Sequence, residues 1–370
     1  MKNYILVIKK DTEFAYIPKE YFLDLFKQNK NWVLLNKYNN EELSFLYNVD
    51  VKFFYNIKCD IANLFMPTHL KYLTNKSNLF HTIQKYLPET YDKYMMYHTD
   101  VDINNLEQYE KLFIDNKKFI LRPTWGFARY GISIFNNFND FKNFMLNIGK
   151  KELNNETDFK KRTNKYNKLV YVLSEFLQNQ LLYNNKVFNF RVFYLISLIN
   201  NKYRSYLILP FVIHLAEKNY NDNLETTSSI SSSFAPHLNI YQDNLKLNDF
   251  EKKFGKDKYI YVLNSIKFIL SKIYKLIKYK KIFKNYDNNN NTYELFGLDF
   301  IADNNFNIKL IEINDQVGLN LKYPPVIYQS ISSAMINSTI NKLYDKEYHI
   351  KIDKNIKKNI IRIHSNKKYL

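Results

Sequence analysis

Cysteine is almost absent from this sequence, since Cys59 is the only one among 370 residues. The lack of cysteine excludes an intramolecular disulfide and a cysteine-based metal site, and it is typical of a reducing compartment. No apolar run approaches the roughly 20 residues that a membrane-spanning helix needs. The apolar run at 4–8 is too short for a signal peptide and turns basic at once. We therefore expect a cytoplasmic protein that makes no use of a membrane.

Glycine is scarce, and several common active-site signatures are missing. The chain has six glycines, whereas average usage of about 7% would give roughly two dozen. No GxxxxGK[ST], GxGxxG, HExxH or GxSxG pattern occurs. Their absence argues against a P-loop, a dinucleotide-binding fingerprint, a zincin-type protease and an α/β-hydrolase.

What the sequence has in excess is positive charge. Lys and Arg number 54 against 36 Asp and Glu, which gives a net charge of +18 and a pI of about 9.4. This charge favours an acidic partner, namely an acidic polypeptide, an anionic membrane or nucleic acid. Asn, Ile, Tyr and Phe, which share AT-rich codons with Lys, are also abundant and offer a second explanation. Nucleic acid is the least favoured partner, because no nucleic-acid-binding motif is present.

The hydrophobic content of 46% is ample for a folded core. Apolar runs and turn residues predict strands at 4–8, 31–38, 117–123, 132–135, 169–177 and 188–199, with one or two more at 203–216. Helices are predicted at 75–91, stopped by Pro88, at 138–149, closed by Gly149, at 258–284, and from about Pro325. Polar stretches at 150–168 and 221–235 are predicted as loops. This order predicts an α+β protein with mixed or antiparallel sheets and flanking helices.

The helix predicted at 258–284 has an apolar stripe with lysines at the other positions. The stripe contains Val262, Ile266, Ile269 and Ile273 at alternating steps of four and three. We interpret it as the side that packs on the core. The alternative is that the lysine-bearing side docks an acidic peptide.

Acidic and amide side chains interrupt a predicted hairpin, "FGLDFIADNNFNIKLIEIND", at 296–315. Glu312 and Asn314 point to one side of their strand, and the turn places Asp299 opposite residues 310–312 on that same side. Buried carboxylates repel each other and lose hydration unless a cation compensates them. Two carboxylates and an amide suit Mg²⁺. The alternative is that each carboxylate pairs with a Lys or Arg.

A second candidate element, "RPTWGFARYGI", follows the strand at 117–123. Gly126 and Gly131 let backbone N–H groups approach a phosphate, and Arg122 and Arg129 place positive charge beside it. The alternative is that Gly126 and Gly131 only allow a hairpin turn and bind no phosphate. Together with the acidic hairpin, this loop predicts a nucleotide site.

Several segments taken together resemble the tubulin–tyrosine ligase family, which has the ATP-grasp fold. They are FILRPTWGFARYGI, YVLSEFL, FNFRVFYLI and LFGLDFIADNNFNIKLIEIND, in the family's order and approximate spacing. NKSNLFHTIQKYLPETY is similar to the family's helix before its PE[ST] turn, and VIHLAEKNY and HLN are similar to its middle section. The likeness covers about 71–328.

The resemblance implies an ATP-grasp protein of three lobes. We expect an N-terminal α/β lobe at 1–74, a central lobe with the phosphate loop at 75–178, a C-terminal lobe with the metal hairpin at 179–345, and a basic tail at 346–370. It also implies a ligase that uses ATP and Mg²⁺ to join a free amino acid to a protein carboxylate through an acyl phosphate. The acceptor would be an acidic protein such as a tubulin C-terminal tail, which implies a cytoskeleton-associated place in the cytoplasm.

The resemblance also assigns roles to residues. It implies that Asp299, Glu312 and Asn314 are metal ligands and that Arg191 and Glu312 have catalytic roles. Together with the glycine-containing loop, the expected nucleotide contacts are Lys76, Arg122, Gly126, Arg129, Gly131, Ser174, Glu175, Phe176 and Leu177. The expected substrate contacts are His214, His237 and Asn239.

Some positions depart from the family pattern. Arg122 stands in place of a Lys, which exchanges a point charge for a planar fork. Ser174 replaces a Gln, Asn189 an Asp, and His214 an Arg. Because these departures concern residues that recognise substrate, two alternatives stay open: a ligase with a non-tubulin acceptor, and an inactive module that binds nucleotide or an acidic protein.

Overall fold

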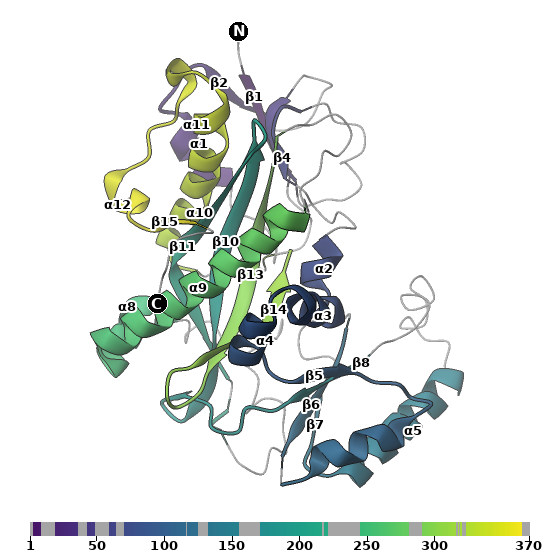
Figure 1. Ribbon diagram of the computed structural model, residues 1–370. Coiled ribbons are helices and arrows are strands. Elements are labelled where there is room, and N and C mark those ends of the chain that lie inside the picture. The colour runs from purple at the N-terminus through teal and green to yellow at the C-terminus, as the bar shows by residue number, and fades with distance from the viewer. Residues whose placement is uncertain are drawn as a thin grey trace.

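The computed structural model describes most of the chain. The described residues are 3–8, 19–35, 43–48, 59–63, 70–115, 117–124, 132–154, 171–216, 218–220, 245–280, 291–315, 317, 319 and 323–364. They form a large sheet and a small sheet with helices around them (Figure 1). None of the helices in these ranges has both the length and the apolar character to cross a membrane.

The large sheet is mixed, as the sequence predicts. Its strands run in the order β12 (Leu245–Lys246), β11 (Lys202–Leu215), β10 (Lys186–Ile199), β13 (Thr292–Ala302), β4 (Ala62–Asn63), β3 (Leu43–Asn48), β1 (Asn3–Ile8) and β2 (Trp32–Leu35). Off this path, β14 (Ile308–Asn314) pairs with β13, β15 (Ile360–Ile363) with β11, and β9 (Leu182–Tyr183) with β10. The long central strands are antiparallel, whereas β4 runs parallel to β13.

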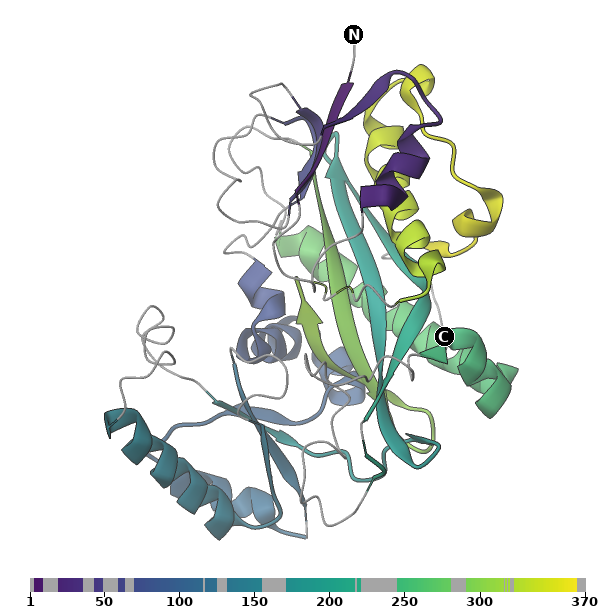
Figure 2. The ribbon, with the colours of Figure 1, turned by 180° about the vertical axis from the view of Figure 1, so that it is seen from behind.

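Both faces of the large sheet are covered, which explains the nearly continuous apolar runs of its central strands. Along β10, Val192 and Tyr194 face one core and Phe193 and Leu195 face the other. On the first face lie α3 (Lys76–Tyr86), α4 (Pro88–Tyr94), α8 (Leu247–Phe254) and α9 (Lys256–Lys280). On the second lie α1 (Lys19–Phe26) and α10 (Pro325–Ser338), seen from behind in Figure 2.

The remaining helical elements are short except for α5. They are α2 (Lys71–Thr74), η3 (Leu106–Phe113), α5 (Phe138–Asn154), α11 (Ile340–Leu343), η5 (Lys346–Tyr348) and α12 (Lys354–Lys357). The apolar stripe predicted for the helix at 258–284 is buried in α9, which confirms its packing on the core.

The small sheet has one apolar and one polar face. Its antiparallel strands run in the order β5 (His98–Asp100), β8 (Tyr171–Glu175), β6 (Phe119–Pro123) and β7 (Ser133–Phe135). Phe119, Leu121 and Leu173 pack with η3 and α5 on the apolar face. Because side chains alternate along a strand, Arg122 and Ser174 lie on the opposite face. On that face His98 of β5, opposite Ser174, stacks on Phe80 of α3.

Three local predictions needed correction. The stop at Pro88 predicted for the helix at 75–91 is confirmed, since α3 begins after its cap Asn75, which accepts a hydrogen bond from Asn78 N at 3.0 Å, and ends at Tyr86. The correction is that a second helix follows, because Pro88 begins α4, where its missing N–H costs nothing. Gly149 does not end its helix, because good helix formers follow it and α5 continues to Asn154. The loop predicted at 150–168 is therefore wrong for 150–154, and 155–170 and 221–235 lie outside the described residues. The lobe boundaries stay a prediction.

Candidate active site

The acidic hairpin is formed by β13 and β14. Asp299 lies directly opposite Glu312, and Gly297 lies opposite Asn314. The Asn314 amide donates a hydrogen bond to Glu312 Oε1 at 3.1 Å. A register shift between Asp299 and Phe300 decides which residue faces Asp299. The expectation that the three oxygen-bearing side chains lie together is confirmed.

Arg191 holds Asp299 from the other side of β13. The two residues are cross-strand neighbours on β10 and β13. The guanidinium donates to both carboxylate oxygens, from Nε to Oδ1 at 2.5 Å and from Nη2 to Oδ2 at 2.8 Å. Both side chains are about nine-tenths buried, with exposures of 11% and 8%. Burial raises the pKa of Asp299 to about 6; Arg191 opposes this rise and Glu312 adds to it.

Gly297 leaves the space that Arg191 fills. A Cβ at this position would lie 3.2 Å from Arg191 Cδ and 3.2 Å from Val317 Cγ1, which is tighter than ordinary van der Waals contact. A side chain here would therefore push on the guanidinium that pairs with Asp299.

Glu312 is surrounded by positive charge. Lys76, the first residue of α3, places its Nζ 3.3 Å from Glu312 Oε2. Burial raises the pKa of the Glu312 carboxyl, but Lys76, a hydrogen bond with Asp299, the Asn314 amide and Arg122 outweigh it and bring the pKa to about 2. Glu312 is therefore ionised at neutral pH.

Arg122 brings a further buried cation to the polar face of the small sheet. Its Nη2 donates to Ser174 Oγ at 3.1 Å and to His98 Nε2 at 3.2 Å. Its Nε has no hydrogen-bond partner among the described residues. Burial lowers the pKa of Arg122, and Glu312 opposes that change. A buried guanidinium with a spare N–H suits an anionic ligand.

The charges of this site favour a phosphate and a divalent ion together. Lys76, Arg122 and Arg191 give three positive charges against two carboxylates, an excess of one. No group of three or more His, Cys, Asp and Glu in the described ranges has the arrangement of a metal site. Asp299, Glu312 and Asn314 therefore fit Mg²⁺ only as a partial ligand set that phosphate oxygens complete, which is how Mg²⁺ is usually held.

Comparison with known families agrees with this geometry. The model of the Tubulin-tyrosine ligase family matches residues 59–347. The chain belongs to this family. Its α+β architecture with mixed sheets is that of an ATP-grasp-like family, whose members are in general ligases that depend on ATP and act on protein carboxylates. No curated protein matches the chain.

Residues 174–177, which the resemblance assigns to the nucleotide, lie at the end of β8 and directly after it. Ser174 and Phe176 are buried, and Leu177 is half-buried. The Glu175 N–H donates to Tyr97 O at 3.0 Å, and the Phe176 N–H donates to Lys118 O at 2.8 Å. The segment thus continues directly from the polar face of Arg122, and its role stays a prediction.

His214 lies on β11 opposite Asn189 and is buried. Its Nε2 lies 2.9 Å from the Tyr323 hydroxyl, and the two rings stack with centroids 6.1 Å apart. Burial and then Arg191 lower the pKa of His214 to about 3, so the ring is neutral. A neutral His cannot supply the charge of the family's Arg, and its contact with substrate stays a prediction.

The other predicted site residues cannot be placed. Gly126, Arg129, Gly131, His237 and Asn239 lie outside the described residues. In contrast, sequence reasoning missed two residues that the structure brings to the site, His98 and Asp100 on β5. The available signal was a polar residue at every second position of "HTD", but three residues are too few to identify a strand.

Proposed function

We propose that this protein is an ATP- and Mg²⁺-dependent ligase that joins an amino acid to a carboxyl group of an acidic protein through an acyl phosphate. The observation that carries the proposal is the pair Asp299 and Glu312, which face each other across β13 and β14. Two buried carboxylates in contact are costly unless cations compensate them. Here Lys76, Arg122 and Arg191 surround the pair, and Arg122 keeps a free N–H.

Each group has a distinct task in this proposal. Asp299, Glu312 and Asn314 would hold Mg²⁺, which would supply positive charge against the negative charge that develops during phosphoryl transfer. Lys76 and Arg122 bind the phosphates. Arg191 keeps Asp299 ionised and oriented from the next strand.

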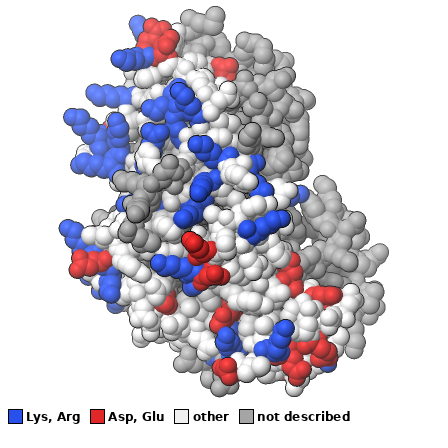
Figure 3. Space-filling model, in the orientation of Figure 1, with Lys and Arg blue, Asp and Glu red and all other residues white. Residues whose placement is uncertain are grey.

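The acceptor is proposed to be an acidic protein, such as a tubulin C-terminal tail in the cytoplasm. One supporting observation is a cluster of basic side chains formed by Arg204, Lys342, Lys357 and Arg362. Burial, then Arg204, Arg362 and Lys357, lower the pKa of Lys342, which shows that these cations lie close together. Figure 3 shows Lys and Arg gathered over the region of α12 and β15. Such a surface attracts acidic chains over a long range.

The test is to incubate the protein with ATP, Mg²⁺, pooled amino acids and tubulin, and to measure the intact mass of tubulin. A mass increment of an amino acid residue would support the proposal and identify the amino acid. Parallel reactions with acidic peptides and with small carboxylates, followed by phosphate release, distinguish a different acceptor. If phosphate is released in none of these reactions, the ligase assignment is contradicted.

One observation favours a second candidate, a module that binds nucleotide or an acidic protein without catalysis. Each carboxylate already has a cationic partner, since Asp299 pairs with Arg191 and Glu312 with Lys76. Under this candidate, Asp299→Ala would leave partner binding and cellular activity unchanged. Loss of both amide formation and cellular function in that variant, with partner binding and the folded state retained, would reject it.

A further inference from the structure

Two polar residues project from the same face of β5 toward the candidate site. His98 and Asp100 are two positions apart, so their side chains lie on one side of the strand. The same pairing places His98 opposite Ser174, and places Asp100 and Arg122 on either side of Val172. Neither His98 nor Asp100 has a part in the function proposed above.

His98 fixes the orientation of Arg122. Its Nδ1 contacts Met96 O, and its Nε2 lies 3.2 Å from Arg122 Nη2. A guanidinium can only donate, so Nε2 accepts and Nδ1 carries the proton that is donated to Met96. The ring stacks on Phe80 with centroids 5.2 Å apart. With burial and Arg122 lowering the pKa of His98 to about 3, the ring stays a neutral acceptor.

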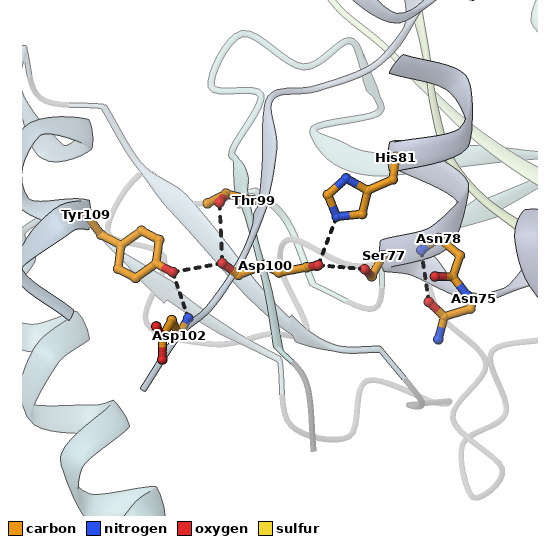
Figure 4. A network of polar contacts seen from close by, with 8 residues as sticks. All are labelled: Asn75, Ser77, Asn78, His81, Thr99, Asp100, Asp102 and Tyr109. Carbon is orange, nitrogen blue, oxygen red and sulfur yellow. Dashed lines mark hydrogen bonds and ion pairs between the residues drawn. The ribbon is translucent and has the colours of Figure 1, made fainter. Parts of the chain in front are cut away.

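Asp100 fixes the first turn of α3. One carboxylate oxygen, Oδ2, accepts from Ser77 Oγ at 2.8 Å and lies 2.9 Å from His81 Nε2 (Figure 4). Ser77 directly follows Lys76, whose Nζ lies beside Glu312. The position of Asp100 is set in turn, because its backbone oxygen accepts from the buried Tyr109 hydroxyl at 2.8 Å.

We propose that β5 is the positioning strand of the phosphate site, with His98 orienting Arg122 and Asp100 orienting Lys76. The two cations come from different elements, β6 and α3. From β5, His98 contacts Arg122 itself, and Asp100 contacts Ser77, the residue that follows Lys76. This inference rests on the proposed function, since it concerns how ATP is bound. His98 and Asp100 act through the cations and are not catalytic residues.

The test measures the Kd of the full-length protein for ATP with Mg²⁺ by calorimetry. The two variants are His98→Phe, which keeps the stacking on Phe80 but accepts no hydrogen bond, and Asp100→Ala. Loss of a hydrogen bond to a charged group should weaken binding about 10- to 100-fold in each. Asp102→Asn is the matched control, because this exposed carboxylate contacts only the nearby Asn104 N–H in the described structure and should leave Kd unchanged.

Double variants distinguish positioning from general support of the fold. In an Arg122→Met background, His98→Phe should change Kd less than about twofold, and Asp100→Ala should behave likewise in a Lys76→Met background. His98→Gln, which retains an acceptor, should recover part of the affinity. If His98→Phe weakens binding by the same factor with and without Arg122, or if Kd follows the loss of thermal stability across all variants, the proposal is wrong.

The experiment also separates this inference from the proposed function. If the wild-type protein binds ATP but the double variants show no coupling, only the role of β5 is overturned. If the wild-type protein binds no ATP, the proposed function and the role of β5 both fail.

Discussion

The two sheets contribute opposite kinds of groups to the site. The large sheet supplies both carboxylates, Asp299 and Glu312, and it supplies Arg191 from the neighbouring strand. The small sheet and α3 supply Arg122 and Lys76. The carboxylate of Asp100 on β5 contacts Ser77 and His81 of α3, and neither cation, in the described contacts. A phosphate chain needs cations, and its divalent ion needs carboxylates. The site therefore depends on the contact between the large sheet and the small sheet with α3.

The sheets also differ in how their polar residues are stabilised. On the large sheet, ion pairs within neighbouring strands balance the charge. On the small sheet, neutral acceptors, His98 and Ser174, hold the charge of Arg122 without cancelling it. The first arrangement stabilises the fold, and the second preserves a cation for a ligand. This difference leads to four predictions.

Arg191→Met should have the largest effect, because it leaves Asp299 buried without its partner. Removing one member of a buried ion pair costs about 3–5 kcal/mol, and the free energy of unfolding in urea should fall by that amount. Arg204→Met is the matched control: no carboxylate partner of Arg204 is described, and its effect should stay within about 1 kcal/mol. A loss for Arg191→Met no greater than for Arg204→Met would show that the ion pair does not hold the large sheet together.

Glu312→Gln should abolish turnover with little change in the fold. The amide keeps the size of the side chain but loses the charge that Lys76 and Mg²⁺ require, and we expect a loss of more than about 100-fold. ATP turnover and the intact mass of the acceptor measure this loss, while circular dichroism monitors the fold. Glu110→Gln, at an exposed position of η3, is the control. Normal turnover in Glu312→Gln would refute the role assigned to this carboxylate.

Gly297→Ala should cost about 1–3 kcal/mol through overpacking, since the new methyl group meets Arg191 and Val317 at 3.2 Å. Chemical unfolding measures the cost. The comparison is Gly255→Asn: no atom lies within 4 Å of a Cβ there, and Asn tolerates a positive φ better than most residues. If the two changes are equally harmless, the space around Arg191 is larger than described.

The smallest predicted effect is a pH dependence of opposite sign at two residues, His98 of the small sheet and Asp299 of the large sheet. The pKa of His98 falls from 6.5 to about 3 because of burial and Arg122, so stability is lost as the pH falls below 6.5. The pKa of Asp299 rises from 3.8 to about 6, so its contribution to stability grows as the pH falls from 6 toward 3.8.

Unfolding curves between pH 4 and 7 test this contrast. As the pH falls, His98→Phe should lose less free energy of unfolding than the wild-type protein, by up to about 1.4 kcal/mol per pH unit, and Asp299→Asn should lose more. A change of the same sign in both variants would contradict the contrast.

Much of the large sheet could be predicted from sequence, and the reason is strand length. Asp299 and Glu312 interrupt long apolar runs, so their positions in a hairpin were visible. The exact partner of Asp299 on β14 could not be predicted, because no sequence pattern marks the register shift next to Asp299. The sequence also left open whether the carboxylates bind a metal or pair with basic residues, and the structure shows ion pairs that are compatible with a metal.

The small sheet was harder to predict because its contacts are distant in sequence. Arg122 and Ser174 are 52 positions apart, yet the first donates a hydrogen bond to the second. Each was recognised as a departure from the family pattern, but only the pairing of β6 with β8 shows that the two departures are in contact. The helix end predicted at Gly149 was wrong for a local reason, since the helix formers around it outweigh the tendency of glycine to end a helix.

The short pairing of β4 with β13 has a practical consequence for dissecting this protein. Thr292 and Tyr293 begin the strand that later carries Asp299, and they pair with Ala62 and Asn63. A fragment that starts after residue 63 would leave that stretch of β13 with open backbone groups and an uncovered aromatic ring. Such an edge invites pairing with another chain, so the shortened protein should self-associate rather than stay monomeric.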